Sequence, residues 1–295
     1  MSQFTLTGFA DEISIDFDQQ LEGLKSLGIG FIEIRMVDGR SVVEYTLDEV
    51  KGLKAKLDAA GIRVSAVGSP IGKVQITEAF DAELTRFRHT MDIAGILETP
   101  YIRMFSFYFP KDKTRADVRD EVIRRLRVFA SEAEARGIIL LHENEHGIYG
   151  ESADDCADLF AAIPSPNFRA VFDPANFVVA GTEVYPYAFN LLKDKIHYLH
   201  IKDAVRNESG YTIKAAGQGT GCVAEVLKEL HRGGFSGFAS LEPHLHSVYQ
   251  QKDVFAAYKA AKERGETGVE YVGDGMGQFK LAYNALVAIL KEVTA

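Results

Sequence analysis

The sequence predicts an α/β fold, a single (β/α)8 barrel with a C-terminal helical extension, in one domain that spans residues 1–295. Short runs of β-forming residues alternate eight times with amphipathic helical segments at nearly even spacing. A doubly wound open sheet would use fewer strands and would carry a recognisable phosphate-binding loop. Glycines that end a helix just before a strand, as at Gly28, Gly61 and Gly137, repeat one local pattern along the chain.

The expected strands are short, rich in β-branched or aromatic residues, and bounded by turn residues. They are Phe4–Phe9, Gly30–Arg35, Ile62–Gly68, Thr99–Phe105, Ile138–His142, Phe168–Phe172, Ile196–Ile201 and Gly237–Leu241. The expected helices place apolar residues on one face. They are Asp16–Leu27, Thr46–Ala60, Thr77–Leu97, Thr114–Arg136, Ser152–Ile163, Glu183–Asp194 and Cys222–Arg232, followed by Gln250–Arg264 and Gly275–Val293 in the extension.

Composition and charge argue against several classes of protein. Apolar residues make up 46% and charged residues 25% of the 295, as in globular proteins that bury a large core. The formal net charge is −9 and Lys and Arg form no dense run, so a nucleic-acid partner is not expected. Two distant cysteines, no signal-peptide pattern and no apolar stretch of bilayer length predict a cytoplasmic protein without a membrane partner.

Four of the later strands carry an ionisable side chain at their carboxyl ends. Glu143 follows the fifth strand and Asp173 follows the sixth, whereas His200 lies in the seventh and Glu242 follows the eighth. Each residue alone could cap a strand or helix, but four at equivalent positions of a barrel meet at one rim, which favours a shared role. Three carboxylates and one imidazole suit Mn²⁺, Mg²⁺ or Co²⁺, and Zn²⁺ is an alternative. Without a cation, carboxylates this close would repel one another.

The motifs around these residues are Glu143–Asn144, the DxxN of Asp173–Asn176, the HxKD of His200–Asp203, and SLEPH at Ser240–His244. Two further motifs are GSPIGK at Gly68–Lys73 and GQG at Gly217–Gly219. As a set they resemble the xylose isomerase-like TIM barrels, and the resemblance covers the whole chain. That superfamily contains sugar and sugar-phosphate isomerases and epimerases as well as endonuclease IV-type DNA-repair enzymes. The resemblance implies one divalent metal ion held by Glu143, Asp173, His200 and Glu242.

In the epimerase branch, the residues that match Glu143 and Glu242 also act as catalytic acid and base. A metal that chelates a carbonyl oxygen and its neighbouring hydroxyl would acidify the α C–H bond and stabilise an enediolate. Glutamates on opposite faces of that plane would invert the carbon, whereas one base moving the proton between carbons would isomerise the sugar. The resemblance also implies that Arg206 binds substrate, whereas Asn176 stands where epimerases often have a His.

Several other polar residues are candidates for substrate contacts. Lys202 shares a strand face with His200, so it reaches either substrate oxygens or a carboxylate. Lys73 follows a glycine at a spacing one residue too short for a P-loop, which leaves a sugar contact as its expected role. Glu33 and Arg35 are expected to face into the barrel, where a buried ion pair across it is favoured over substrate binding. Arg103 has the same two interpretations.

Two groups of histidines lie near the predicted ligands in the sequence. His244 and His246 follow Glu242 and either line the rim or lie on a surface loop, and the surface loop is favoured. The segment His142–His146 reads HENEH, a formal match to the zinc-protease motif HExxH. That motif requires a helix with both histidines on one face, whereas this segment continues a strand and ends at Gly147. A metalloprotease is therefore not favoured.

The leading hypothesis is a metal-dependent sugar or sugar-phosphate isomerase or epimerase that uses α-proton abstraction and an enediolate intermediate, with Mn²⁺ as the expected metal ion. The alternative on the same scaffold is a lyase or dehydratase acting on a cyclitol or keto-sugar. Two less favoured hypotheses are endonuclease IV-like DNA repair and a non-catalytic sugar-binding barrel. The expected partner is a small sugar, and the final helices with the loop Gly265–Gly277 offer a surface for a homo-oligomer.

Overall fold

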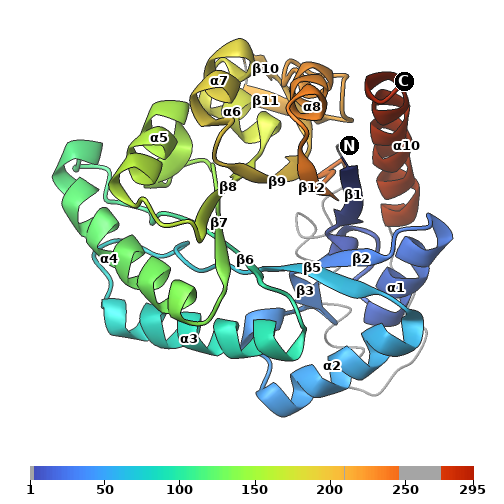
Figure 1. Cartoon of the computed structure of the whole chain (residues 1–295), viewed down its shortest axis with the longest axis horizontal. Coiled ribbons are helices and arrows are strands. Elements are labelled where there is room, and N and C mark those ends of the chain that lie inside the picture. The colour runs from blue at the N-terminus through green and yellow to red at the C-terminus, as the bar shows by residue number, and fades with distance from the viewer. Residues whose placement is uncertain (1–2, 209, 246–273) are drawn as a thin grey trace.

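Eight parallel strands curve into a nearly closed barrel surrounded by helices in the computed structural model, which describes residues 3–208, 210–245 and 274–295 (Figure 1). The hydrogen-bonded order of the strands is β1-β12-β9-β8-β7-β6-β5-β2, which confirms the predicted barrel. The barrel strands are β1 Gln3–Gly8, β2 Phe31–Ile34, β5 Arg63–Gly68, β6 Tyr101–Met104, β7 Ile139–Glu143, β8 Phe168–Phe172, β9 Ile196–Ile201 and β12 Ser236–Leu241.

The helices between the strands lie close to their predicted ranges, except that the predicted helix Glu183–Asp194 is α-helical only over Phe189–Leu192. They are α1 Phe17–Ser26, α2 Leu47–Ala60, α3 Phe80–Ile96, α4 Arg115–Ala135, α5 Ala153–Ala162, α7 Phe189–Leu192 and α8 Val223–Arg232. Thr46 and Thr114 begin α2 and α4 with capping boxes, which satisfy backbone N–H groups that an isolated helix end would leave unpaired. No helix in the described ranges is long and apolar enough to cross a membrane.

The C-terminal extension is present as α10 Gly275–Val293, which packs near β1 and β12 at the edge of the barrel (Figure 1). The predicted helix Gln250–Arg264, His246 and most of the loop Gly265–Gly277 lie outside the described residues. Within the described residues, a short helix and two hairpins that follow barrel strands were not predicted. They are the short helix α6 Pro174–Ala180, the hairpin of β3 Met36–Val37 with β4 Arg40–Ser41, and the hairpin of β10 Asp203–Asn207 with β11 Gly210–Lys214.

The inside of the barrel is a packed core that is separate from the larger core. The larger core lies between the sheet and the helices and includes Phe87 and Phe129. The inner core joins Leu141, Val171 and Tyr198 from three neighbouring strands. Alternate residues of a strand face one side, so the inward positions that follow these three are Glu143, Asp173 and His200. The apolar floor of the barrel therefore supports the charged rim directly.

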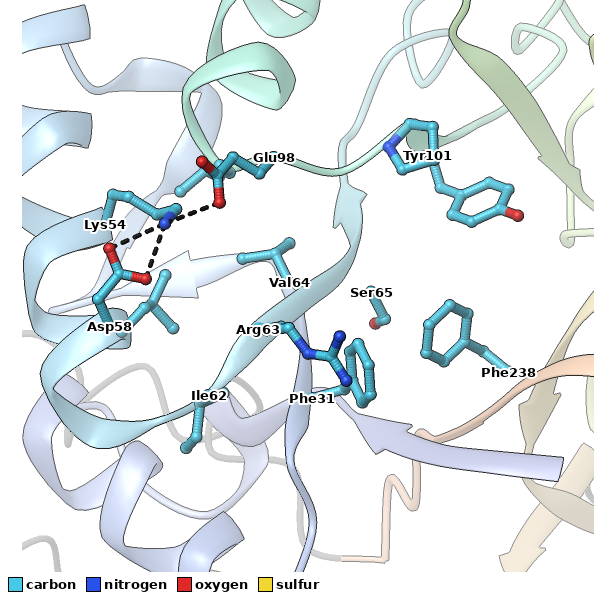
Figure 2. A pocket seen from close by; sticks show the side chains of 13 residues that line it. Phe31, Lys54, Asp58, Ile62, Arg63, Val64, Ser65, Glu98, Tyr101 and Phe238 are labelled. Carbon is cyan, nitrogen blue, oxygen red and sulfur yellow. Dashed lines mark hydrogen bonds and ion pairs between the residues drawn. The ribbon is translucent and has the colours of Figure 1, made fainter.

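The amino-terminal end of the barrel contains a cavity of about 330 Å³ (Figure 2). Aromatic rings from three strands line it, namely Phe31, Tyr101 and Phe238, together with the buried Ser65. The guanidinium of Arg63 lies 4.3 Å from the centre of the Phe31 ring. This cavity lies at the opposite end from the residues expected to bind a metal ion.

Candidate metal centre

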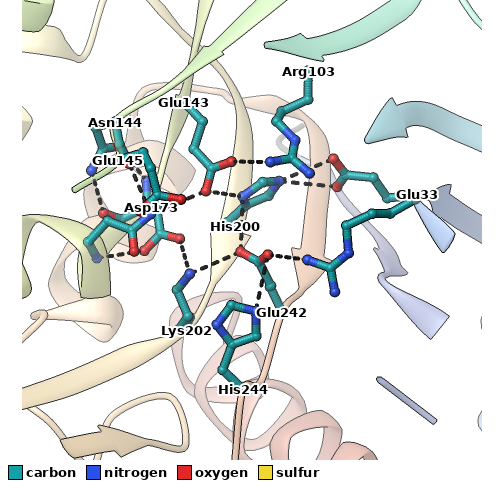
Figure 3. Close-up of polar contacts among 12 residues, drawn as sticks. Glu33, Arg103, Glu143, Asn144, Glu145, Asp173, His200, Lys202, Glu242 and His244 are labelled. Carbon is teal, nitrogen blue, oxygen red and sulfur yellow. Dashed lines mark hydrogen bonds and ion pairs between the residues drawn. The ribbon is translucent and has the colours of Figure 1, made fainter. Parts of the chain in front are cut away.

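The structure brings the four predicted metal ligands together at the carboxyl-terminal rim (Figure 3). One ligand atom each from Glu143, Asp173, His200 and Glu242 can be chosen so that all four atoms lie within 4.8 Å of one another. All four side chains are buried, and they come from β7, β9 and the residues just after β8 and β12. Together they can bind a divalent metal ion, because they offer hard oxygen ligands and one nitrogen.

His200 presents one ring nitrogen to the other ligands and the other to a carboxylate behind it. Its Nδ1 lies 3.0 Å from Glu143 Oε1 and 3.4 Å from Glu242 Oε2, whereas its Nε2 lies 3.2 Å from both oxygens of Glu33. A proton on Nε2 that is donated to Glu33 leaves the Nδ1 lone pair free for a metal ion. Such an outer carboxylate fixes the tautomer and orientation of a metal-binding histidine. Sequence analysis placed Glu33 inside the barrel but did not identify this role.

Two buried ligand atoms support the fit of a cation to this centre. Within the described part of the chain, Asp173 Oδ2 and His200 Nδ1 are buried atoms that make no hydrogen bond of good geometry. The nearest charged neighbour of Asp173 Oδ2 is the ammonium of Lys202, at 2.9 Å. Buried polar atoms without a hydrogen bond are rare in proteins and call for a partner. A divalent ion would satisfy both atoms at once.

The DPAN motif positions both Asp173 and the neighbouring ligand. Asp173 caps α6, because its side chain accepts a hydrogen bond of 2.9 Å from the backbone N–H of Asn176, and Pro174 suits the first turn. The side-chain amide of Asn144 makes two hydrogen bonds with the backbone of Asp173. Its Nδ2 donates to the Asp173 carbonyl at 2.9 Å, and its Oδ1 accepts from the Asp173 N–H at 3.0 Å. The Asn176 amide donates to Glu143 Oε1 at 3.2 Å. Asn176, predicted to bind substrate, thus also holds a metal ligand in place.

Each glutamate of the centre has its own arginine. Arg103 Nη1 lies 3.0 Å from Glu143 Oε2, and Arg35 Nη1 lies 2.8 Å from Glu242 Oε1. A Cβ atom on Gly68 would lie 2.7 Å from Cε1 of Phe9 and 3.2 Å from Cβ of Arg35. Glycine at the end of β5 therefore leaves room for the Phe9 ring and for the start of the Arg35 side chain.

The structure agrees with the prediction that Glu33 and Arg35 face into the barrel and form ion pairs across it. Arg35 pairs with Asp11 at 2.9 Å and with Glu242, whereas Glu33 contacts His200. Arg35 also lies over the ring of Phe9, 4.3 Å from its centre. The physical reason is that side chains two residues apart on a strand point in parallel, so each meets what lies across the barrel rather than its neighbour.

The predicted substrate residues have different surroundings. Lys202 is buried, and its ammonium lies 2.9 Å from Asp173 Oδ2 and 3.0 Å from Glu242 Oε2, between two metal ligands. Lys73 is half-buried, pairs with Glu145 at 2.7 Å, and lies against the ring of Phe105. Lys202 is therefore at the centre, and Lys73 is at its border.

Arg206 lies apart from the cluster, on the exposed hairpin of β10 and β11. Its guanidinium stands beside Gly181, where a Cβ atom would collide with it. The structure therefore does not bring Arg206 into contact with the four metal ligands.

Asp203, the last residue of the HxKD motif, organises a loop. Its buried carboxylate accepts hydrogen bonds of 2.8–3.0 Å from the backbone N–H groups of Gly217, Gly219 and Gly221. A Cβ atom on Gly219 would lie 2.2 Å from Asp203 Oδ1, so only glycine lets the loop approach this closely. The GQG motif is thus explained by packing around Asp203 and not by a contact with the metal centre.

Burial opposes the charged form of each ligand, and neighbouring charges decide which groups stay ionised. Burial raises the pKa of Glu143, but protonated His200 and Arg103 together outweigh burial and lower this pKa to about 2. Lys202 similarly holds the pKa of Glu242 well below its usual range. For Asp173, burial outweighs the attraction of Lys202, and the pKa rises to about 6. The centre thus carries anionic charge at neutral pH, which attracts a cation.

The two predictions about histidines have opposite outcomes. β7 is a strand, and His142 on its outer face packs against Phe160 and Phe168, so the helical zinc-protease motif is absent as expected. His244, expected on a surface loop, instead lies against Glu242, with its Nε2 atom 3.4 Å from Glu242 Oε1. Sequence analysis missed this contact because it depends on the backbone turn after Glu242.

Comparison with known proteins agrees with this geometry. The family model of the xylose isomerase-like TIM barrel matches residues 21–281. The chain belongs to the xylose isomerase-like TIM barrel family. No curated protein matches the sequence. Members of this family include many enzymes, which fits a buried polar centre at the carboxyl ends of the strands.

Solved structures similar to the chain share its fold at low sequence identity. The IOLI protein, solved with a zinc atom, has a TM-score of 0.76 and 17% identity, with 98% of this chain and 99% of that chain covered. An L-ribulose 3-epimerase has a TM-score of 0.70 and 18% identity, with 100% and 96% covered. The probable 3-DHS dehydratase AsbF of Bacillus anthracis has a TM-score of 0.66 and 16% identity, with 89% and 99% covered.

Proposed function

We propose that the protein is a metal-dependent isomerase or epimerase of a sugar or sugar phosphate, with Mn²⁺ as the expected metal ion. One observation carries this proposal. Glu143 and Glu242 come from different strands, and one carboxylate oxygen of each lies beside the His200 Nδ1 atom, at 3.0 and 3.4 Å (Figure 3). Two separate carboxylates at one metal site are what removal of a proton by one group and its return by another requires.

The residues of the chain divide the work of this reaction. A bound divalent ion would acidify the α C–H bond of a chelated hydroxy-carbonyl group and stabilise the enediolate. Glu143 and Glu242 are ionised at neutral pH and can each accept a proton. Arg103 and Arg35 hold these two carboxylates in fixed positions through contacts of 3.0 and 2.8 Å. Such preorganisation lowers the barrier, because the groups need no rearrangement during the reaction.

The proposed substrate contacts follow from the charges at the rim. Lys202 is the cation closest to the ligands, so we propose that it binds a substrate oxygen near the reacting carbon. Asn176 and Lys73 are proposed to bind the sugar from the sides of β8 and β5, and Arg206 from the hairpin. A cytoplasmic enzyme that acts on small carbohydrates would fit this set of residues.

Conservative substitution of the two glutamates tests the proposal. Glu143→Gln and Glu242→Gln each keep the shape of the side chain but remove a base, so turnover should fall by at least about a thousandfold. Glu44→Gln, on an exposed turn, is the matched control and should keep full activity. The measurement is metal-dependent exchange of the α hydrogen in D₂O across free ketoses, aldoses and sugar phosphates. Full activity of either glutamate variant would contradict the proposal.

Product analysis separates the proposed reaction from the lyase alternative. Both begin with the same proton abstraction, but a dehydratase or lyase expels a leaving group instead of returning the proton. An epimer or isomer of unchanged mass supports the proposal, and loss of water from a cyclitol or keto-sugar supports the alternative. Mass spectrometry of the product distinguishes the two directly.

A further inference from the structure

A second group of potential ligands lies beside the predicted metal centre and shares one residue with it. Glu12, Glu242 and His244 each offer an atom, and these atoms lie within 4.8 Å of one another. Glu12 belongs to the turn after β1, and His244 follows β12 by three residues. Neither Glu12 nor His244 contributes to the four-ligand centre.

The distances in this group match the edges of a metal coordination shell. His244 Nε2 lies 3.4 Å from Glu12 Oε1 and 3.4 Å from Glu242 Oε1. Two ligand atoms bound tetrahedrally to one Zn²⁺-like ion, with bonds of about 2.1 Å, are about 3.4 Å apart. These distances are longer than an ordinary hydrogen bond between nitrogen and oxygen. One coordination position would stay open for water.

The two oxygens of Glu242 face different groups. Oε2 lies 3.0 Å from Lys202 and 3.4 Å from His200, on the side of the four-ligand centre. Oε1 lies 3.4 Å from His244 and 2.8 Å from Arg35, on the other side. One carboxylate can therefore bind an ion through each oxygen.

Glu12 supplies an independent sign that a ligand belongs here. Its side chain is 4% exposed, and within the described residues Oε1 makes no hydrogen bond of good geometry. The closest cations to this atom are His244 at 3.4 Å and Arg35 at 3.5 Å. Its other oxygen accepts a hydrogen bond of 2.7 Å from the backbone N–H of His244. That bond aims Oε1 at the gap between the two side chains.

The backbone of His244 is held in an unusual conformation. Its φ is 48°, in the left-handed region that non-glycine residues rarely adopt. Backbone strain of this kind is found where a side chain must point in a particular direction. Here the turn brings the imidazole back over Glu242. The ring is also partly exposed, which gives an ion a route from solvent.

The buried charges around the two groups favour bound cations. Six acidic side chains around them are buried, namely Asp11, Glu12, Glu33, Glu143, Asp173 and Glu242. Among the described residues, the permanently charged side chains that contact them are Arg35, Arg103 and Lys202. These three cations leave the six carboxylates with excess negative charge, and buried anionic charge without a partner is costly.

We propose that Glu12, Glu242 and His244 form a second site for a divalent cation such as Zn²⁺ or Co²⁺. It binds more weakly than the four-ligand centre, because it has three ligands and because the guanidinium of Arg35 competes for Glu242 Oε1. An ion on that oxygen blocks its use as a proton acceptor. Filling the second site therefore inhibits the enzyme, a consequence that rests on the proposed function, whereas the binding itself does not.

Metal stoichiometry of the full-length chain tests the site without any activity assay. After chelation, equilibrium dialysis against Co²⁺ should give two ions per chain, with the second bound more weakly. Glu12→Gln and His244→Gln should each weaken the second ion by more than about a hundredfold, beyond the usual cost of losing an outer partner of a metal ligand. His146→Gln, which changes an exposed loop histidine, should keep both ions.

The wild-type spectrum provides a readout that needs no variant. Two Co²⁺ ions joined by one carboxylate should be magnetically coupled, and a new absorption of four-coordinate Co²⁺ should follow the second equivalent. A single ion per chain at saturating Co²⁺ would overturn the proposal, as would two ions of unchanged affinity in both Glu12→Gln and His244→Gln.

An activity titration separates this proposal from the proposed function. With rising Co²⁺, isomerase or epimerase activity should increase over the first equivalent and fall by at least about tenfold over the second. His244→Gln should lose the falling phase. If two ions bind but no sugar is turned over, the proposed function fails and the second site stands. If sugar is turned over and only one ion binds, the second site fails and the proposed function stands.

Discussion

The two ends of the barrel are built from the same strands but have opposite chemistry. At the amino-terminal end, Phe31, Tyr101 and Phe238 line a cavity (Figure 2). At the carboxyl-terminal end, the same strands β2, β6 and β12 lead into Glu33, Arg103 and Glu242 (Figure 3). Each pair is separated by only two or four residues along a strand.

The difference between the ends separates stability from chemistry. The aromatic and aliphatic layer removes apolar surface from water and makes no demand on charge. The rim does the reverse, because it buries like charges that repel one another. Burial of the aromatic and aliphatic layer therefore stabilises the fold, and this free energy offsets the cost of burying like charges at the rim. Substitutions at the two ends should accordingly affect different measurements.

The largest effect is expected from the lower layer. Leu141→Ala removes a fully buried side chain two residues before Glu143 and should lower the free energy of unfolding by about 2–5 kcal/mol. Urea denaturation measures this loss. Metal affinity should stay within a few-fold of the wild type, since no ligand changes. Leu191→Ala, at an exposed position, should cost less than about 0.5 kcal/mol. A large loss of metal affinity in Leu141→Ala would contradict the proposal that the apolar layer affects stability and not metal binding.

The next effect concerns the rim. Glu33→Gln weakens the acceptor behind His200 Nε2 and should reduce metal affinity by about 10–100-fold, with a smaller change in stability. Calorimetric titration with Mn²⁺ measures the affinity, and Glu44→Gln serves as the matched surface control. Unchanged affinity in Glu33→Gln would mean that Glu33 does not orient His200.

The smallest effect distinguishes two buried histidines. Burial lowers the pKa of His142 to about 4, whereas Glu143 and Glu33 raise the pKa of His200 against its burial. The pKa of His142 is lower in the folded protein than in the unfolded chain. As the pH falls, the unfolded chain therefore binds a proton at His142 at a higher pH than the folded protein does. Stability is therefore lost as pH falls below about 6.5, by about 1 kcal/mol between pH 7 and pH 5.5.

Urea denaturation at pH 7 and pH 5.5 measures the free energy of unfolding at each pH. Comparing the wild type with variants isolates the contribution of His142. His142→Leu should lose about 1 kcal/mol less than the wild type over that interval, while His146→Leu, at an exposed position, should behave as the wild type does. Equal pH dependence in all three proteins would show that folding does not change the pKa of His142, which would contradict the prediction.

Local signals in the sequence were enough to predict the barrel. Helix caps such as Thr46 and helix-ending glycines such as Gly61 act within a few residues, so they can be read without the fold. Strand ends that carry Glu143, Asp173, His200 and Glu242 could be aligned because every strand of a parallel barrel ends at one rim. Helix α6 was missed because it is short and begins at Pro174, directly after a strand.

Contacts across the barrel could not be predicted in the same way. Glu33 was placed on the correct face, but its contact with His200 links residues 167 positions apart. The pairing of β2 with β5 also has a local register shift, which sets Glu33 beside Ala66. Glu12 and His244 approach each other through two turns of irregular backbone, and no periodic pattern in the sequence reports such turns.

Each rim residue of β7, β8 and β9 lies two positions after an inner-core residue that faces the same side. This spacing limits how the chain can change in evolution. Deleting one residue between Tyr198 and His200 would send His200 to the outside of the barrel and would break the packing around it. Insertions in the hairpin of β10 and β11 would leave every ligand in place, since that hairpin lies beyond the strand. Relatives of this chain should therefore differ in length almost entirely within the loops above the rim, where new substrate specificities can arise without rebuilding the strands.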